Sequence, residues 1–179
     1  MLICYVGAMF ASKTTSMINK INEFEEKGRK CIILSPAKDT RRPEGFIRTH
    51  DGKTKEAITV NSLDEIIELT KGKEIIAFDE IQFFADGIIE IIDSLLDQNK
   101  VVLVSGLDTD YNKIPFGVTM KLCAIADKVI KCKGRCKICR RPSRFSYRKV
   151  KSFERVLLGS GEEYLPVCRG CYNRLKRKE

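Results

Sequence analysis

Short, nearly continuous apolar runs recur along the first three quarters of the chain. Such runs are typical of strands that are buried on both faces of a sheet. We therefore expect strands at Leu2–Val6, Cys31–Leu34, Ile75–Phe78 and Val101–Val104, with a last one near Lys128–Lys131.

Between these runs, apolar residues recur at helical spacing. The spacing predicts helices at Thr15–Glu26, Leu63–Leu69 and Ile88–Leu96. Because parallel strands need crossover connections, the alternation predicts an α/β fold with a parallel sheet that helices cover on both faces.

Two regions break this alternation. The stretch Ser35–Lys55 is polar and holds Pro36, Pro43, Gly45 and Gly52, so we expect a long loop there. From about Gly134 onward, cysteine, arginine and turn residues dominate. We place a domain boundary at that point, with a main domain over residues 1–133 and a small second domain over residues 134–179.

Composition places the protein among soluble globular chains. Of its 179 residues, 43% are hydrophobic and 32% are charged, and no apolar run reaches the roughly 20 residues that cross a bilayer. The apolar start, Met1–Phe10, lacks the basic lead-in and the cleavage site of a signal peptide, so it is expected to be a buried strand. We expect a cytoplasmic protein without a membrane partner.

Four of the eight cysteines form two Cys-x-x-Cys pairs near the C-terminus, Cys136 with Cys139 and Cys168 with Cys171. In a reducing compartment such pairs are more often metal ligands than disulfides. Four thiolates around Zn²⁺ leave no open coordination position, so the predicted zinc site is structural. The 28 residues between the pairs would form a loop tied at its base by the metal. Free or disulfide-linked cysteines are the alternative.

The net charge is +9, and basic residues are frequent at the C-terminal end and beside the cysteine pairs. Basic proteins often bind nucleic acid or other polyphosphates. The simpler interpretation is a solvated basic tail together with local neutralisation of the zinc-bound thiolates, so we do not expect a nucleic-acid partner. We expect Cys4, Cys31, Cys123 and Cys132 to be ordinary buried thiols.

A phosphate loop (P-loop) follows the first predicted strand. Gly7-Ala8-Met9-Phe10-Ala11-Ser12-Lys13-Thr14 has the first glycine, the lysine and the hydroxyl residue of the pattern, and it lies between a buried strand and a helix. In such a loop, backbone N–H groups hold phosphate oxygens, Lys13 neutralises the outer phosphates and Thr14 can ligate Mg²⁺. Ser12 is the one departure, since the pattern has a second glycine there. If that position needs a positive φ, serine costs about 1 kcal/mol.

An acidic pair ends the strand Ile75–Phe78. Asp79 is placed to hold Mg²⁺, directly or through water, and Glu80 to accept a proton from an attacking hydroxyl. A polar strand end that merely faces solvent is the alternative for this pair.

The order of these motifs resembles that of the small, zinc-containing, cytosolic type of thymidine kinase over nearly the whole chain. The matching stretches are the phosphate loop, Ala37-Lys38-Asp39-Thr40-Arg41, Asp79-Glu80-x-Gln82-Phe83-Phe84, Gly106-Leu107-Asp108 with Tyr111, Pro115-Phe116-Gly117 and both cysteine pairs.

The resemblance implies transfer of the γ-phosphoryl group of ATP to the 5′-hydroxyl of thymidine, with Mg²⁺. It makes Glu80 the catalytic base and places Asp79 and Gln82 near the metal, with Asp39 and Arg41 near the phosphates. An arginine there could stabilise charge during transfer. It also implies a homotetramer and inhibition by thymidine triphosphate.

The resemblance further implies that the zinc-tied loop covers the nucleoside. The residues that match the walls of the thymine pocket are Met9, Phe83, Leu107, Tyr111, Phe116, Ser146, Arg155, Leu157, Gly159 and Tyr164. Core packing is the alternative for the five before Ser146. Arg155 departs from the family, in which that position is usually apolar.

Two other functions remain open on the residues alone. Ser12 would suit a nucleotide-binding regulator or an inactive relative, and the acidic pair with the basic tail would suit a nucleic-acid-dependent ATPase. The latter would need further motor motifs, for which the chain is too short.

Overall fold

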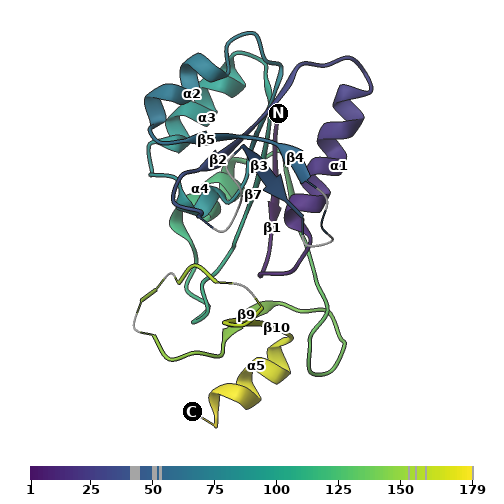
Figure 1. The fold of residues 1–179 in the computed structure, drawn as a ribbon, viewed down its shortest axis with the longest axis vertical. Helices are drawn as coiled ribbons and strands as arrows, with labels where there is room; N and C mark the ends of the chain where they lie inside the picture. Colours follow the sequence, from purple (N-terminus) through teal and green to yellow (C-terminus); the bar gives the residue numbers. More distant parts are fainter. Residues whose placement is uncertain are drawn as a thin grey trace.

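The computed structural model describes residues 1–40, 45–49, 52, 54–152, 154–155, 157–159 and 161–178. Its main element is a six-stranded sheet with the order β5-β2-β6-β7-β1-β8 (Figure 1). Every neighbouring pair in this sheet is parallel. The strands are β1 (Leu2–Val6), β2 (Cys31–Pro36), β5 (Ile58–Val60), β6 (Ile75–Phe78), β7 (Val101–Gly106) and β8 (Lys128–Lys131).

Helices cover both faces of the sheet, as the sequence predicts (Figure 1). One face packs on α1 (Lys13–Glu25). The other packs on α2 (Leu63–Leu69), α3 (Ile88–Asp97) and α4 (Gly117–Ile125). Alternate residues of β1 divide between the two faces, with Leu2 and Cys4 in one apolar cluster and Ile3 and Tyr5 in the other. The central strands are buried on both sides for this reason, which explains their continuous apolar runs.

The prediction of a single long loop over Ser35–Lys55 is wrong. A short antiparallel hairpin, β3 (Phe46–Arg48) and β4 (Thr54–Glu56), lies within it, and β2 extends to Pro36. Ile47 is fully buried in the α1-side cluster, and Lys55 donates hydrogen bonds to Asn22 and Glu25 of α1. In β3 only Ile47 is buried, between the exposed Phe46 and Arg48, and a strand of three residues is too short to show a clear alternation of apolar and polar positions.

A small C-terminal unit lies beyond the carboxyl ends of the sheet strands (Figure 1). It contains the antiparallel pair β9 (Phe145–Arg148) and β10 (Tyr164–Val167), followed by α5 (Arg169–Lys176). Its apolar cluster includes Phe145, Tyr172 and the four paired cysteines. The domain boundary between residues 133 and 134 stays a prediction.

Within the described ranges, no helix combines the length and the apolar character that crossing a membrane requires.

Candidate active site

The phosphate loop begins with a glycine that no other residue could replace without strain. Gly7 has φ 150°, and a Cβ added there would lie 2.6 Å from the carbonyl oxygen of Cys132, which follows β8. The Cys132 backbone would collide with any side chain at this position, and residues with a side chain rarely adopt this φ. The tight turn out of β1 therefore depends on this glycine.

Ser12 has φ 56° and ψ 32°, in the left-handed region. The position therefore requires the positive φ for which the pattern uses glycine, and serine carries a strain of about 1 kcal/mol. Phe10 also has a positive φ, of 63°. The carbonyl of Ser12 accepts hydrogen bonds from Ser16, from the N–H at 3.0 Å and from the hydroxyl at 2.9 Å, so the loop still leads correctly into α1.

Lys13 is a buried cation that faces the acids of the site. Its Nζ donates to the carbonyl oxygen of Ala8 at 2.9 Å. Burial lowers the pKa of Lys13, while the charges of Glu80 and Asp79 oppose that shift. A desolvated ammonium gains strongly from an anionic partner, so this side chain is suited to a phosphate group.

Thr14 and Asp79 form the pair expected for a divalent cation. The Thr14 hydroxyl donates to Asp79 Oδ1 at 3.0 Å, and the Ser105 hydroxyl of β7 donates to the same oxygen. Asp79 is fully buried. The alternative that the acidic pair faces solvent is therefore wrong for Asp79. Hydroxyl and carboxylate oxygens are ligands that Mg²⁺ accepts. No motif in the sequence indicates a role for Ser105.

Glu80 is held in a fixed direction by its neighbours. Its backbone lies in the left-handed region, with φ 52° and ψ 46°. The side-chain amide of Gln82 donates to the Glu80 carboxylate, and its oxygen accepts from the Leu107 N–H at 2.9 Å. Gln82 thus links the carboxylate to the loop after β7. The position of Gln82 near the metal stays a prediction.

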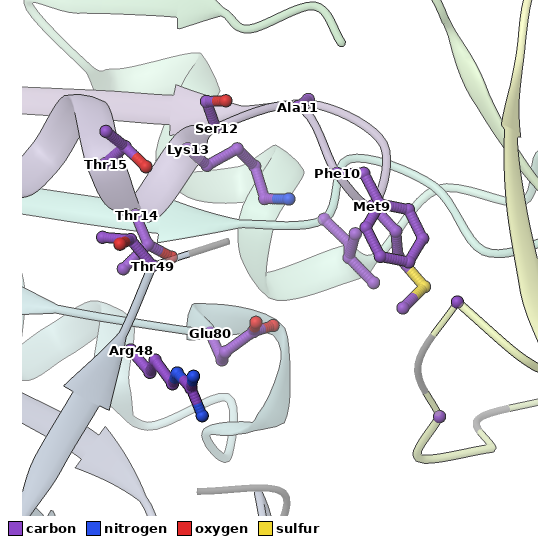
Figure 2. A pocket seen from close by; sticks show the side chains of 13 residues that line it. Met9, Phe10, Ala11, Ser12, Lys13, Thr14, Thr15, Arg48, Thr49 and Glu80 are labelled. Carbon is purple, nitrogen blue, oxygen red and sulfur yellow. The ribbon is translucent and has the colours of Figure 1, made fainter. Parts of the chain in front are cut away.

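A cleft of about 460 Å³ opens beside the phosphate loop. In Figure 2 the Lys13 ammonium, the Glu80 carboxylate and the Arg48 guanidinium surround it. Arg48 and the neighbouring Thr49 come from β3 and its end, which the sequence had assigned to a loop. The predicted site residues that line this cleft are Met9, Phe10, Ala11, Ser12, Lys13, Thr14, Glu80, Leu107 and Gly159.

A second, smaller cavity of about 30 Å³ adjoins the first, and Met9 and Leu107 line both. It brings together nine of the ten residues predicted for the thymine pocket, and Gly159 lines the larger cleft instead. The nine are Met9, Phe83, Leu107, Tyr111, Phe116, Ser146, Arg155, Leu157 and Tyr164. They come from distant parts of the chain and share one apolar space, as a ligand site requires. Thr109, Asp110 and Leu158 also line it, without a signal in the sequence.

The C-terminal unit touches the phosphate loop directly. The Met9 N–H donates to Ser146 Oγ of β9 at 2.9 Å. Gly134 lies so close to Phe10 that an added Cβ would collide with the Phe10 carbonyl oxygen. The two parts of the chain therefore build one site.

The four paired cysteines form a cluster in which all sulfur atoms lie within 4.8 Å of one another. Metal–sulfur bonds of about 2.3 Å in a tetrahedron place sulfur atoms about 3.8 Å apart, and Cys139 Sγ lies 3.5 Å from Cys168 Sγ. A hydrogen bond from the Arg141 side chain lowers the pKa of Cys139 to about 6. Arg174 donates to Cys171 Sγ at 3.0 Å and lowers the pKa of that thiol, but burial and the neighbouring cysteines raise it to about 11, so the thiols share protons until a cation replaces them. The cluster could therefore hold a metal ion as thiolates. The four cysteines are not among the residues that line either cavity.

The remaining predicted site residues line neither cavity or lie outside the described residues. Asp39 lies in the turn after β2, where its N–H donates to the Pro36 carbonyl oxygen at 3.1 Å, and it lines neither cavity. Gly7 and Ala8 are buried and line neither cavity. Arg41 lies outside the described residues, as does His50, to which the sequence assigns no role.

A phosphate loop, a buried acid directly after β6 and a second cavity that meets the first define a phosphate-loop enzyme with two substrates. The family model for thymidine kinase matches residues 1–172. The chain therefore belongs to the thymidine kinase family, which confirms the resemblance seen in the motifs.

Individual relatives agree with this assignment. The thymidine kinase of Bacteroides fragilis is 36% identical over 178 residues, which cover 99% of this chain and 88% of the relative. Thymidine kinase 1 of Dictyostelium discoideum is 33% identical over 171 residues, which cover 93% of this chain and 75% of the relative. The thymidine kinase of Mycoplasmoides gallisepticum is 36% identical over 171 residues, which cover 91% of this chain and 76% of the relative. Neither the regulator nor the nucleic-acid-dependent ATPase gains support from these matches.

The strain at Ser12 leads to a test of the phosphate loop. Ser12→Gly should leave the KM for ATP equal or lower and the melting temperature equal or higher, because glycine adopts a positive φ without steric cost. Steady-state kinetics and a thermal melt measure both quantities. Ser94→Gly is the matched control: it is an exposed residue of α3, away from the phosphate loop, where glycine costs about 0.5 kcal/mol, and it should lower the melting temperature. A large loss of activity in Ser12→Gly would show that the serine hydroxyl has a role of its own.

Proposed function

We propose that the protein is an ATP-dependent thymidine kinase of nucleotide salvage, which transfers the γ-phosphoryl group of ATP to the 5′-hydroxyl of thymidine and of deoxyuridine. The observation that carries this proposal is the junction of the two cavities at Met9 and Leu107, with Glu80 in the wall of the larger one. A nucleoside whose base enters the small cavity, once that cavity has widened, can extend its 5′-hydroxyl towards phosphates in the larger cleft. The two reactants would then meet beside a carboxylate.

On the ATP side, the backbone N–H groups of the phosphate loop and the start of α1 are suited to hold phosphate oxygens. The Met9 N–H is an exception, because Ser146 already accepts it. Lys13 would leave the Ala8 carbonyl for the outer phosphates. Thr14 and Asp79 would hold Mg²⁺, which neutralises phosphate charge when it is bound.

In the transfer step, Glu80 would accept the proton of the 5′-hydroxyl while that oxygen attacks the γ-phosphorus. A new P–O bond forms as the bond between the γ-phosphorus and the β,γ-bridging oxygen breaks, and the electron pair leaves with ADP. The hydrogen bond from Gln82 fixes the direction of the carboxylate. Lys13 and, by resemblance, Arg41 would neutralise charge on the transferred group, with Asp39 nearby.

On the nucleoside side, Phe83, Tyr111, Phe116 and Leu157 supply apolar walls for a flat base. Ser146 accepts a hydrogen bond from Met9, and its own hydroxyl hydrogen is then suited to donate to a base oxygen. Gly159 and Tyr164, also by resemblance, complete the covering side.

Three further properties are part of the proposal. The metal in the cysteine cluster is Zn²⁺, with a structural role, because four thiolates leave no open position. The protein works in the cytoplasm as a homotetramer, and exposed apolar side chains on α2, α4 and β8 (Ile67, Met120, Ile125 and Val129) are suited to subunit contacts. Thymidine triphosphate inhibits it, by family resemblance.

The role of Glu80 can be tested directly. Glu80→Gln should lower thymidine-dependent ADP formation about 10²- to 10⁴-fold, because the amide cannot accept the proton. A coupled assay with ATP, Mg²⁺ and thymidine measures the rate. Glu68→Gln, at an exposed residue of α2, is the control and should retain activity. Normal turnover in Glu80→Gln would remove Glu80 as the base.

The metal assignment has its own test. Protein purified without chelator should contain about one zinc per chain by elemental analysis. Cys168→Ser should lose the zinc and melt at a lower temperature, because metal binding contributes to folding. Cys31→Ser is the matched control, since Cys31 lies in β2 outside the cluster, and it should keep its zinc. Active wild-type protein free of metal would contradict the proposal.

A further inference from the structure

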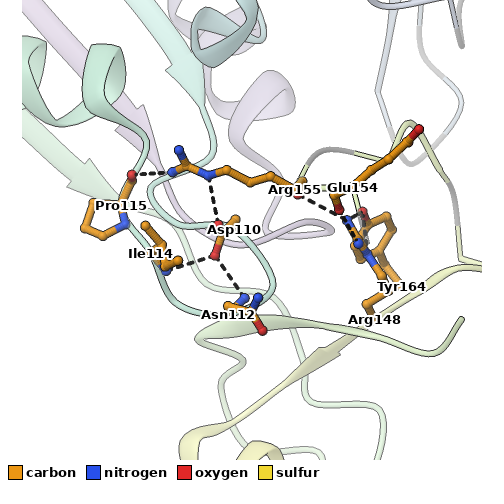
Figure 3. A network of polar contacts seen from close by, with 8 residues as sticks. All are labelled: Asp110, Asn112, Ile114, Pro115, Arg148, Glu154, Arg155 and Tyr164. Atoms are coloured by element: carbon orange, nitrogen blue, oxygen red, sulfur yellow. Dashed lines mark hydrogen bonds and ion pairs between the residues drawn. The ribbon is translucent and has the colours of Figure 1, made fainter. Parts of the chain in front are cut away.

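Arg155 makes a set of contacts that an apolar residue could not make. Its Nε donates to Asp110 Oδ2 at 3.0 Å, and its Nη2 donates to the Pro115 carbonyl oxygen at 2.8 Å (Figure 3). The guanidinium also lies 5.3 Å from the ring centre of Phe116. All three partners belong to the segment 108–116, which forms one wall of the small cavity.

Asp110 is built to receive this arginine. Its side chain is only 2% exposed, and its Oδ1 accepts the N–H groups of Asn112 and Ile114 at 2.9 Å each. Oδ1 of Asp110 thus stabilises the turn that contains it, and Oδ2 accepts the hydrogen bond from Arg155. A buried carboxylate without a cation is costly, so the loop gains from the pair.

On the other side, the backbone around Arg155 is fixed by a second arginine. Arg148 of β9 is buried, and its guanidinium donates to the carbonyl oxygens of Glu154 at 2.5 Å and Arg155 at 3.1 Å (Figure 3). It also donates to the Tyr164 hydroxyl at 2.9 Å, which in turn donates to the Leu157 carbonyl oxygen at 2.9 Å. The backbone carbonyls of Glu154, Arg155 and Leu157 are therefore attached to the β9–β10 pair. The Arg155 side chain reaches in the other direction, to the loop after β7.

We propose that Arg155 is a positioning residue that latches residues 154–155 and 157–159 (the covering segment) onto Asp110, and so sets how tightly the nucleoside is enclosed. The inference rests on the proposed function and assigns Arg155 a role other than contact with the base. A cavity of about 30 Å³ cannot admit a nucleoside unless the covering segment moves, so the latch opens for entry and release. Neither Arg155 nor Asp110 lines the phosphate cleft, so the chemical step is not affected.

The Arg155 side chain is 52% exposed, so the pair is partly screened by solvent. Arg155→Met keeps the aliphatic stem and removes the guanidinium. Asp110→Asn keeps an acceptor for Asn112 and Ile114 and removes the charge. Each variant should raise the KM for thymidine about fivefold and speed thymidine release by a similar factor. The kcat and the KM for ATP should stay within about twofold, which a general loss of structure would not allow.

The double variant should be no worse than either single variant, because both remove one interaction. The KM of the wild type for thymidine should rise with salt, and that of Arg155→Met should not. Lys121→Met, which breaks the exposed Lys121–Asp86 pair, is the matched control and should behave as wild type. Additive effects, unchanged thymidine kinetics in Arg155→Met, or an equal rise in both KM values would overturn the latch.

Hydrogen–deuterium exchange of the nucleoside-free protein separates this inference from the proposed function. Amides of the covering segment should exchange faster in Arg155→Met and Asp110→Asn than in the wild type. Equal exchange would overturn the latch even if the wild type phosphorylates thymidine. A wild type without thymidine turnover would instead refute the proposed function, and the exchange result would still decide the latch.

Discussion

The backbone of the phosphate loop is strained, and residues 132–134, which follow β8, pack closely against it. Phe10 and Ser12 both carry side chains at a positive φ. Such residues persist only where the surroundings over-determine them. Here the surroundings are the carbonyl of Cys132 beside Gly7, the close approach of Gly134 to Phe10, and the hydroxyl of Ser146, which accepts the Met9 N–H. The loop that would hold ATP therefore depends on residues more than 100 positions later.

This dependence connects the cysteine cluster to both substrates. The cluster fixes the base of β9 and β10, and these strands carry Ser146, Arg148 and Tyr164 into the site. From α5, the Tyr172 hydroxyl donates to the Tyr111 carbonyl oxygen at 2.7 Å, and the Arg148 guanidinium lies 3.7 Å from the Tyr111 ring centre. A metal ion held by the four cysteines would thus influence nucleoside binding through packing alone.

The sequence predicted the parallel core because its strands are buried on both faces and leave continuous apolar runs. It also predicted the phosphate loop, the Asp79–Glu80 pair and the paired cysteines, because each has a fixed local spacing. It missed the β3–β4 hairpin, whose strands have three residues each, and with it Arg48 in the cleft wall. Helix α4 was missed as well, since its apolar residues do not form one clear face. Contacts such as those of Asp110 and Ser105 depend on tertiary neighbours that no local pattern records.

The central claim is that a nucleoside hydroxyl and the γ-phosphate of ATP meet beside Glu80, where the two cavities join. The most direct measurement supplies γ-labelled ATP and Mg²⁺ with either thymidine or 5′-deoxythymidine, which lacks the attacking hydroxyl, and separates the labelled products. The account predicts labelled thymidine 5′-monophosphate from the first and no labelled nucleotide product from the second. Release of labelled inorganic phosphate at equal rates with both nucleosides, without thymidine monophosphate, would contradict it.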